Sequence, residues 1–456
     1  MTSKAVLSYN GYMGKCCYQA GNMNKKTFIA ILLATAFFAA QPQGSAFAQN
    51  FEPSLDEGLA AFNYGDNELA GRHFWALAGK GDPVAQYYLA YMLDTGMGMG
   101  QDLVSAANWY LKSAQQDYLP ALVYTGYMYS TGHGVTKEDR QAFKWYTRAA
   151  QMGDAIAQNN LATMLQSGRP YKKNLPLASQ WFIQSAMQGN MRAQYNIATM
   201  YRTGDGVKKN YAEAIRWYTY AANQGDMYAQ NALAYMYRNG IGVEKNDKTA
   251  VDWYRRAAEQ GHEPSQFSIA RMYEQGLSDG TKNVQDAAIW YYHAAEKGNA
   301  RAQHRLGYLY EMGNGLPQDY TQAVKWYKKA ADENGFTPSM DALGIIYQLG
   351  KGVKADSQKA REWFQKAAEA GDAFGQFYLA KLYRDGIGVG ADPVIAYQWF
   401  VLCLGGLPDG ELKADAISSR VSVANGLTPD QLDRAKQFIS SFKPKLPIIK
   451  NKAVKK

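Results

Sequence analysis

The chain has 456 residues, 47% of them hydrophobic and 20% charged. This composition excludes an intrinsically disordered chain, and the length exceeds what one compact core usually supports, although it suits an array of repeats. The net charge of +9 comes from the two ends, because residues 1–48 contain four lysines, residues 443–456 contain six, and neither segment contains an acidic residue. The body between them is close to neutral, so the charge does not favour a nucleic-acid partner.

The first part of the chain has the three-part layout of a secretory signal peptide. Lys25 and Lys26 precede an apolar run over residues 28–40, and Ala46-Phe47-Ala48 then forms a small-x-small cleavage site. The run is too short to span a bilayer, and no later segment of the sequence is long and apolar enough to do so. We therefore expect cleavage after Ala48 and a mature protein that is periplasmic or secreted. The alternative is a buried N-terminal helix.

The place of the apolar run also bears on the start of the protein and on its cysteines. The layout fits a start at Met23 better than one at Met1, which makes residues 1–22 a candidate over-long start. Cleavage would leave Cys403 as the only one of the three cysteines. A single cysteine forms no internal disulfide, so we expect stability to come from helix packing.

Self-similarity with a period of about 36 residues runs through the body of the chain. Nine of the ten tryptophans recur at intervals of 36 or 37 residues, and Tyr or Phe follows each of them. These nine are Trp109, Trp145, Trp181, Trp217, Trp253, Trp290, Trp326, Trp363 and Trp399. A fixed period of this length is the sequence signature of a solenoid.

Other positions keep step with the tryptophan. Alanine stands three residues before it in all nine units, and alanine stands five residues after it in eight. These spacings fit a helix whose small residues let a neighbouring helix approach closely. Seven residues before the tryptophan stands an Asp or Asn that is expected to cap the helix, except at Glu138, where Asp139 follows.

A second pattern fills the rest of each unit. The tryptophan helix ends at a glycine, as in Gly153-Asp154, and glycine readily takes the left-handed conformation that terminates a helix. Another helix then carries Ala-Gln-x-x-Leu-Ala-x-Met-Tyr, as from Ala193 to Tyr201, and ends in Gly-x-Gly-Val. We call the Ala-Gln helix the first helix of each unit and the tryptophan helix the second.

This unit of helix, glycine turn, helix and glycine turn resembles the Sel-one-like repeat (SLR), a relative of the tetratricopeptide repeat. The resemblance covers residues 81–406 in nine units and implies an all-α fold, a right-handed α-solenoid superhelix of antiparallel helix pairs. Three places depart from the pattern. Asp117 replaces a unit-opening glycine, Pro170 replaces a turn glycine, and the turn from Gly276 to Gly280 is irregular and one residue longer.

The segments that flank the repeats look like caps, which a solenoid needs because its end faces would otherwise expose apolar surface. We expect capping helices over residues 49–80 and over residues 407–442, where Thr428 and Pro429 form a helix start. Residues 443–456 form a Lys-rich tail that is predicted to be solvated. A weak contact with a polyanion through this tail is the alternative.

Function is expected at the positions that vary between units, because the recurring positions are needed for packing. The tryptophans are accordingly predicted to be core residues, with Trp→Ala in mid-array costing about 3–5 kcal/mol. Counted from the alanine of the Ala-Gln step as zero, positions 2 and 6 share one face of the first helix. By resemblance to the family, first helices line the concave side of the superhelix. The predicted partner-binding groove consists of Tyr87, Tyr91, Tyr127, Asn159, Tyr195, Asn231, Tyr235, Arg271, His304, Tyr308 and Lys381. The alternative for each tyrosine is packing at the repeat interface.

The sequence contains no recognisable catalytic motif. Its five histidines are scattered without metal-ligand spacing, and the run from Gly96 to Gly100 lacks the Lys-Ser/Thr of a phosphate loop. We predict no enzyme, no cofactor and no metal site. The predicted function is a scaffold or adaptor that binds a protein or peptide in its groove, in envelope assembly, signalling or host interaction. The alternative is an envelope enzyme or cell-wall ligand binder of the penicillin-recognising type, although family members of that type carry paired cysteines that this chain lacks.

Overall fold

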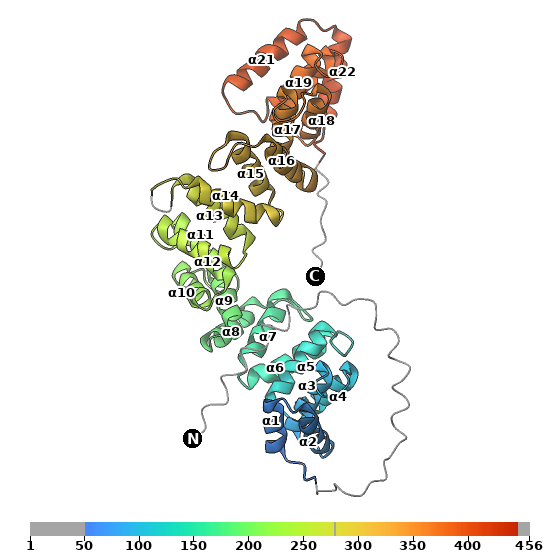
Figure 1. The fold of residues 1–456 in the computed structure, drawn as a ribbon, viewed down its shortest axis with the longest axis vertical. Helices are drawn as coiled ribbons and strands as arrows, with labels where there is room; N and C mark the ends of the chain where they lie inside the picture. Colours follow the sequence, from blue (N-terminus) through green and yellow to red (C-terminus); the bar gives the residue numbers. More distant parts are fainter. Residues whose placement is uncertain (1–50, 278–279, 446–456) are drawn as a thin grey trace, which may run out of the picture.

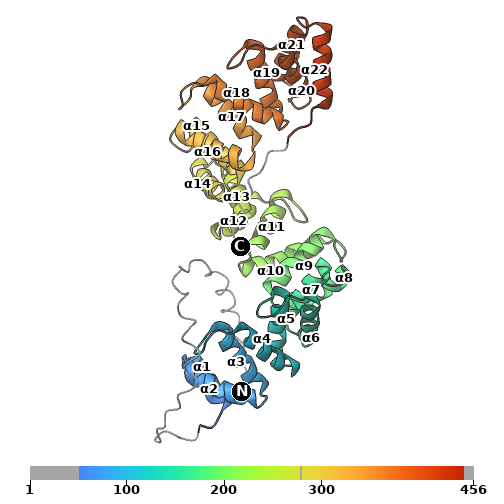
Figure 2. The ribbon, with the colours of Figure 1, turned by 90° about the vertical axis from the view of Figure 1, so that its right-hand side faces the viewer.

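The computed structural model describes residues 51–277 and 280–445, so the predicted signal peptide and most of the predicted basic tail lie outside the described residues. The described residues form 22 α-helices and no strand. The helices follow one another in a single elongated, superhelical stack with the N-terminal helices at one end (Figure 1, Figure 2). The last two helices, α21 (Glu411–Ala424) and α22 (Pro429–Ser441), lie at the other end.

Nine helix pairs form the body of the stack, between the N-terminal pair α1 (Leu55–Tyr64) and α2 (Asn67–Gly79) and the C-terminal pair α21 and α22. The first helices are α3 Pro83–Thr95, α5 Leu119–Thr131, α7 Ala155–Ser167, α9 Met191–Thr203, α11 Met227–Asn239, α13 Glu263–Gln275, α15 Ala300–Met312, α17 Thr337–Leu349 and α19 Ala373–Asp385. The second helices are α4 Leu103–Gln115, α6 Asp139–Gln151, α8 Leu175–Met187, α10 Tyr211–Asn223, α12 Asp247–Glu259, α14 Val284–Glu296, α16 Tyr320–Asn334, α18 Ser357–Glu369 and α20 Pro393–Cys403. Each packs against its neighbours in the chain, and the predicted all-α solenoid of helix pairs is confirmed.

Polar caps set where the second helices begin. In eight of the nine, an Asp or Asn side chain accepts a hydrogen bond from a backbone N–H of the first turn, as Asn246 does from Thr249 at 2.9 Å. Glu138 is the exception, as its sequence indicated, and it makes no side-chain cap. The capping prediction therefore holds because a short polar side chain reaches the free N–H groups of the first turn.

Glycines close the turns, and one of them also permits a close approach. Gly242, in the turn after α11, has φ +70°, and a Cβ there would lie 2.2 Å from the Cβ of Tyr211 at the start of α10. Only glycine fits this position without displacing its neighbour. Asp117, which replaces a glycine, is the one non-glycine residue with positive φ (63°) in the part of the chain that the structure describes.

The two aromatic residues of the second helix are buried to different degrees, which refines the prediction that the tryptophans are core residues. The Tyr or Phe after the tryptophan is buried in all nine units, with at most 3% of its surface exposed. Five of the nine tryptophans are buried, and four are half-buried: Trp109, Trp181, Trp253 and Trp290. A helix turns by about 100° per residue, so the tryptophan lies at the edge of the interface when the next residue points to its centre. A cation covers two of these four tryptophans, as Lys112 does at 4.0 Å from the centre of a Trp109 ring and Arg256 at 4.6 Å from the centre of a Trp253 ring.

A buried glutamine explains the Ala-Gln step. Gln230 Nε2 donates to the carbonyl oxygen of Ala222 near the end of α10 (3.0 Å), and Gln230 Oε1 accepts from Gln260 Nε2 after α12 (2.8 Å). The same two bonds form at Gln86, Gln158 and Gln194. One amide thus ties a first helix to the second helix before it and to the second helix after it.

Candidate functional site

Successive first helices approach each other closely. Direct contacts join α5 to α7 and α17 to α19, although a second helix lies between them in the sequence. Side chains join others: Asn196 Nδ2 donates to Asn159 Oδ1 (3.3 Å), and Ser265 Oγ donates to Asn231 Oδ1 (2.9 Å). In a curved stack, the helices on the inner side lie closer to each other than those on the outer side. We therefore take the face of the first helices as the candidate functional surface.

Position 2 of the first helix is mainly a joint between units. Tyr87 and Asn159 are buried, whereas Tyr195, Asn231 and His304 are half-buried. His304 Nδ1 lies 3.0 Å from the hydroxyl oxygen of Ser339 on the next first helix. Burial, together with the positive charge of nearby Arg305, lowers the pKa of His304 to about 4, so its imidazole is neutral at neutral pH. A groove role for these five residues stays a prediction, and they offer a partner little surface.

Position 6 faces away from the joint and is more open. The side chain of Tyr235 is 51% exposed and that of Tyr127 is 42% exposed, and Arg271 is exposed as well. Because the three belong to α11, α5 and α13 at the same register, they present one repeated row of variable side chains.

Three further predicted residues of position 6 are half-buried: Tyr91, Tyr308 and Lys381. The guanidinium of Arg305 lies 4.5 Å from the centre of the Tyr308 ring. Lys381 Nζ lies 3.1 Å from a carboxylate oxygen of Asp415 on α21. These contacts hold the side chains of Tyr308 and Lys381 in fixed orientations, which lowers the entropy cost of binding a partner.

A layer of charged side chains lies near the C-terminal ends of α13 and α15, and the sequence prediction missed it. Glu274 Oε1 accepts a hydrogen bond from Arg305 Nε (2.8 Å), and Glu274 Oε2 accepts one from the Tyr291 hydroxyl (2.8 Å). Glu311 Oε2 likewise accepts from the Tyr327 hydroxyl (2.8 Å). Burial and the neighbouring carboxylate raise the pKa of each tyrosine well above its usual range.

Position 9 of the first helix carried the signal for this layer. Glu274 and Glu311 both occupy it, on the same face as positions 2 and 6. The sequence shows charges at this position, but it does not show that tyrosine hydroxyls from the second helices reach them.

The described residues supply no catalytic constellation. Burial raises the pKa of the Cys403 thiol to about 12, so this sulfur stays protonated and is a poor nucleophile. In residues 51–277 and 280–445, no three His, Cys, Asp or Glu side chains come together as metal ligands. None of the helices described is long and apolar enough to cross a membrane.

A stack of helix pairs with recurring packing residues, and with variable residues on the first helices, defines a helical-repeat protein of the tetratricopeptide-like class. The Sel1 repeat model matches nine times, at residues 83–118, 119–154, 155–190, 192–226, 228–262, 264–299, 300–335, 337–372 and 373–402. The chain therefore belongs to the Sel1 repeat family, as its resemblance to Sel-one-like repeats predicted. Repeats of this kind typically form non-catalytic scaffolds that bind protein partners, and no enzyme family is indicated.

Solved structures include similar chains. One is c5321, a protective antigen of uropathogenic Escherichia coli with an SLR fold, which is 30% identical over 82% of this chain and 95% of that chain, with a TM-score of 0.48. Another is a Sel1 repeat protein from Oxalobacter formigenes, 29% identical over 54% of this chain and 100% of that chain, also with a TM-score of 0.48. No curated protein gave a match.

Proposed function

We propose that this protein is an exported adaptor that holds a segment of a protein partner against the face of its first helices. The observation that carries the proposal is the row at position 6, where Tyr127, Tyr235 and Arg271 are exposed at the same register of three first helices. Tyrosine and arginine are enriched among residues that dominate binding energy at protein interfaces.

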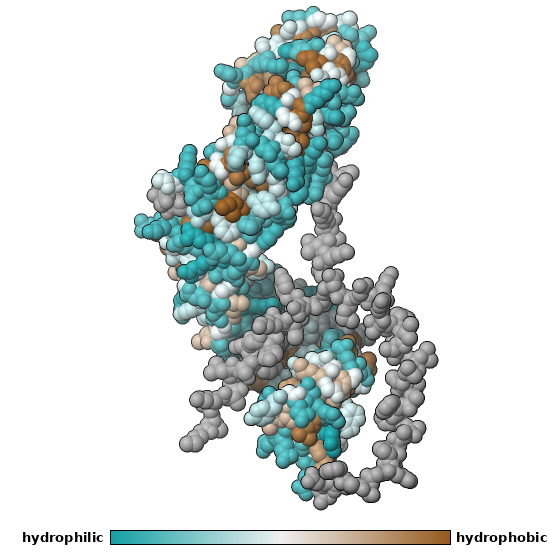
Figure 3. Space-filling view, in the orientation of Figure 1, coloured by the Kyte–Doolittle hydropathy of each residue, from teal (hydrophilic) through white to brown (hydrophobic). Residues whose placement is uncertain are grey.

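The polarity of the molecular surface favours a partner that binds reversibly. The face seen in Figure 3 is mostly hydrophilic, and its hydrophobic side chains gather in small separate patches. Obligate interfaces are larger and more apolar, whereas transient ones combine aromatic anchors with polar groups. The exposed tyrosines, together with Arg271 and the Glu274–Arg305 pair on α13 and α15, fit a partner segment that offers both apolar and charged side chains.

Export is part of the proposal and is supported by residues 1–48. Two lysines, an apolar run and a small-x-small site follow one another in the order that the secretory machinery recognises. We propose a periplasmic or secreted adaptor in envelope assembly, signalling or host interaction. Cleavage is tested by N-terminal sequencing of the protein from the culture medium and the periplasm: Gln49 as the first residue supports export, and an intact N-terminus in the cytoplasm contradicts it.

The partner is tested by affinity capture with a matched control. The bait is compared with a triple variant, Tyr127→Ala, Tyr235→Ala and Arg271→Ala, and with a control, Tyr171→Ala and Tyr220→Ala, whose tyrosines are 53% and 47% exposed outside the first helices. We expect the triple variant to fail to capture a protein that the control captures. Both variants should unfold at the same temperature as the original chain. A partner kept by the triple variant but lost by the control would move the binding surface to the second helices and refute the proposal.

A further inference from the structure

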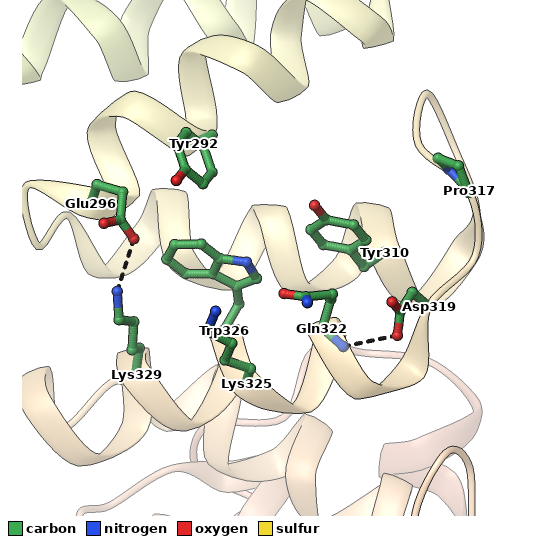
Figure 4. Close-up of a pocket in the computed structure, with 9 residues that line it drawn as sticks. All are labelled: Tyr292, Glu296, Tyr310, Pro317, Asp319, Gln322, Lys325, Trp326 and Lys329. Atoms are coloured by element: carbon green, nitrogen blue, oxygen red, sulfur yellow. Dashed lines mark hydrogen bonds and ion pairs between the residues drawn. The ribbon is translucent and has the colours of Figure 1, made fainter.

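A polar pocket lies at the junction of the sixth and seventh units, away from the row at position 6. It has a volume of about 630 Å³ and lies between α14, α16 and the turn after α15. Figure 4 shows Tyr292, Trp326 and Tyr310 side by side along it, with the Glu296–Lys329 pair at one end and Asp319 at the other. The size is in the range of pockets that hold small ligands.

The aromatic wall of the pocket is held in place before any ligand arrives. The rings of Tyr292 and Trp326 meet edge to face, with centres 5.8 Å apart. Lys329 Nζ lies 2.9 Å from Glu296 Oε1 and 4.6 Å from the centre of a Trp326 ring. Trp326 is therefore covered and only 2% exposed, while Tyr292 keeps 46% of its surface open.

Two lining residues are peculiar to this junction and are not needed by the repeat. The position two residues after the tryptophan holds Tyr only at Tyr292, and the position nine residues before it holds Pro only at Pro317. Other units have Thr147, Thr219 or Ile183 at the first of these positions. The fold does not require an aromatic ring there, so Tyr292 is available for a function specific to this unit.

The polar groups of the pocket indicate what would bind. Glu296 and Asp319 balance Lys325 and Lys329, so the lining carries no net charge. Carboxylates accept hydrogen bonds, ammonium groups donate them, and the Gln322 amide and the two tyrosine hydroxyls do both. Such a lining matches a neutral ligand with many hydroxyl groups, and the exposed ring of Tyr292 matches the apolar face of a sugar ring.

We propose that this pocket binds a short, neutral oligosaccharide. The proposal is independent of the adaptor function, because the exposed row at position 6 contributes nothing to the lining. A proline-rich peptide is disfavoured, because such peptides need open aromatic grooves and Trp326 is already covered by Lys329.

The test uses the purified protein and three neutral tetrasaccharides: chitotetraose, maltotetraose and cellotetraose. Binding is followed by saturation-transfer NMR and titration calorimetry. The variants are Tyr292→Thr and Gln322→Leu, which copy the residues at the same register in other units, Thr147 and Leu177, so folding is preserved. The control is Tyr220→Thr, because Tyr220 is 47% exposed and also lies edge to face with a tryptophan, Trp217, at 5.6 Å.

We expect at least one tetrasaccharide to bind, with about tenfold weaker affinity in each pocket variant and unchanged affinity in Tyr220→Thr. Affinity should also stay nearly constant between low and high salt, because the ligand carries no charge. The proposal is overturned if none of the three binds, or if Tyr292→Thr binds as well as the original chain. It is also overturned if only a proline-rich decapeptide, or a charged tetragalacturonate, binds in a manner that depends on Tyr292.

Discussion

At the scale of single residues, a buried glutamine amide that joins three helices recurs in four of the units. Gln230 satisfies the carbonyl group of Ala222, and Gln260 satisfies the oxygen of Gln230. Leaving such a buried group without a partner costs about 1–3 kcal/mol, whereas replacing both partners by apolar side chains is nearly neutral. The second unit already does the latter, because Leu122 and Met152 stand where other units have two glutamines.

We therefore predict that Gln230→Leu lowers the free energy of unfolding by about 1 kcal/mol, because it removes both hydrogen bonds of the buried Gln230 amide while the Ala222 carbonyl keeps its bond from the backbone N–H of Gly225. Adding Gln260→Met should cost little more, since the bond between the two amides is already lost and the pair then copies Leu122 and Met152 of the second unit. Urea unfolding of the two single variants and the double variant measures the coupling. Strictly additive effects would mean that the two amides do not depend on each other.

Asp341 is a carboxyl group at position 2 of its first helix, where Asn159 and Asn231 stand in other units. It is 8% exposed, and burial together with the charge of nearby Asp372 raises the pKa of Asp341 to about 9. A pKa above the unfolded value means that the folded state favours the protonated acid. The contribution of protonated Asp341 to the free energy of unfolding is therefore fully present below about pH 4 and is lost as the pH rises towards 9.

Asp341→Asn copies the neutral form and should remove this pH dependence. We expect the variant to gain about 2 kcal/mol in unfolding free energy at pH 8 and little at pH 4, because only the ionised acid is penalised by burial. Denaturant unfolding at both pH values measures the difference in free energy between the variant and the original chain. The control is Asp82→Asn, which replaces the N-cap residue of α3. An equal gain at both pH values would show that the pKa of Asp341 is not responsible.

At the scale of elements, the second helix shows where sequence periodicity stops being informative. Trp181 and Phe182 recur with the same period, so the pattern alone does not tell which of them faces the core. The structure separates them, because Phe182 is fully buried and Trp181 is half-buried. The caps of the second helices and the glycine turns agreed with the sequence prediction, since each depends on residues within one turn of the helix end.

The same limit applies to the candidate site. Positions 2 and 6 share a helix face, but their exposure depends on the neighbouring unit, which helical spacing does not describe. Asn159 is buried against Asn196, thirty-seven residues later, whereas Tyr235 is 51% exposed. The pocket around Tyr292 also escaped prediction, because its lining comes from two units and an intervening turn.

Comparison of the aromatic pair gives a prediction at this scale. Phe182→Ala should cost about 3–5 kcal/mol, the usual range for a buried aromatic residue, and Trp181→Ala should cost clearly less despite its larger side chain. The reason is that Phe182 fills the centre of the interface and leaves a cavity that the helices cannot close. Thermal and urea unfolding of both variants checks the order, and a larger loss for Trp181→Ala would restore tryptophan as the principal core residue.

At the scale of the whole molecule, stability is a sum over neighbouring units, so damage should stay local. The C-terminal end makes this testable. Phe438 and Phe442 lie edge to face with Trp399, at 5.6 and 5.4 Å, and thereby cover the last unit. The backbone N–H of Lys445 then donates to the carbonyl oxygen of Glu369 (2.7 Å), which fixes the chain after α22 to the end of α18.

We predict that Phe438→Ala with Phe442→Ala loosens the last unit alone. The loss of about 3 kcal/mol should speed amide hydrogen exchange in α19, α20 and α21 roughly a hundredfold and leave α3 to α6 unchanged, because only interfaces next to the damage are weakened. Exchange measured by mass spectrometry resolves the two ends. Tyr64→Ala is the control, since Tyr64 is 91% exposed at the other end and should change neither. Equal acceleration along the chain would mean that the array unfolds as one unit, and coupling between neighbours alone would then not describe this solenoid.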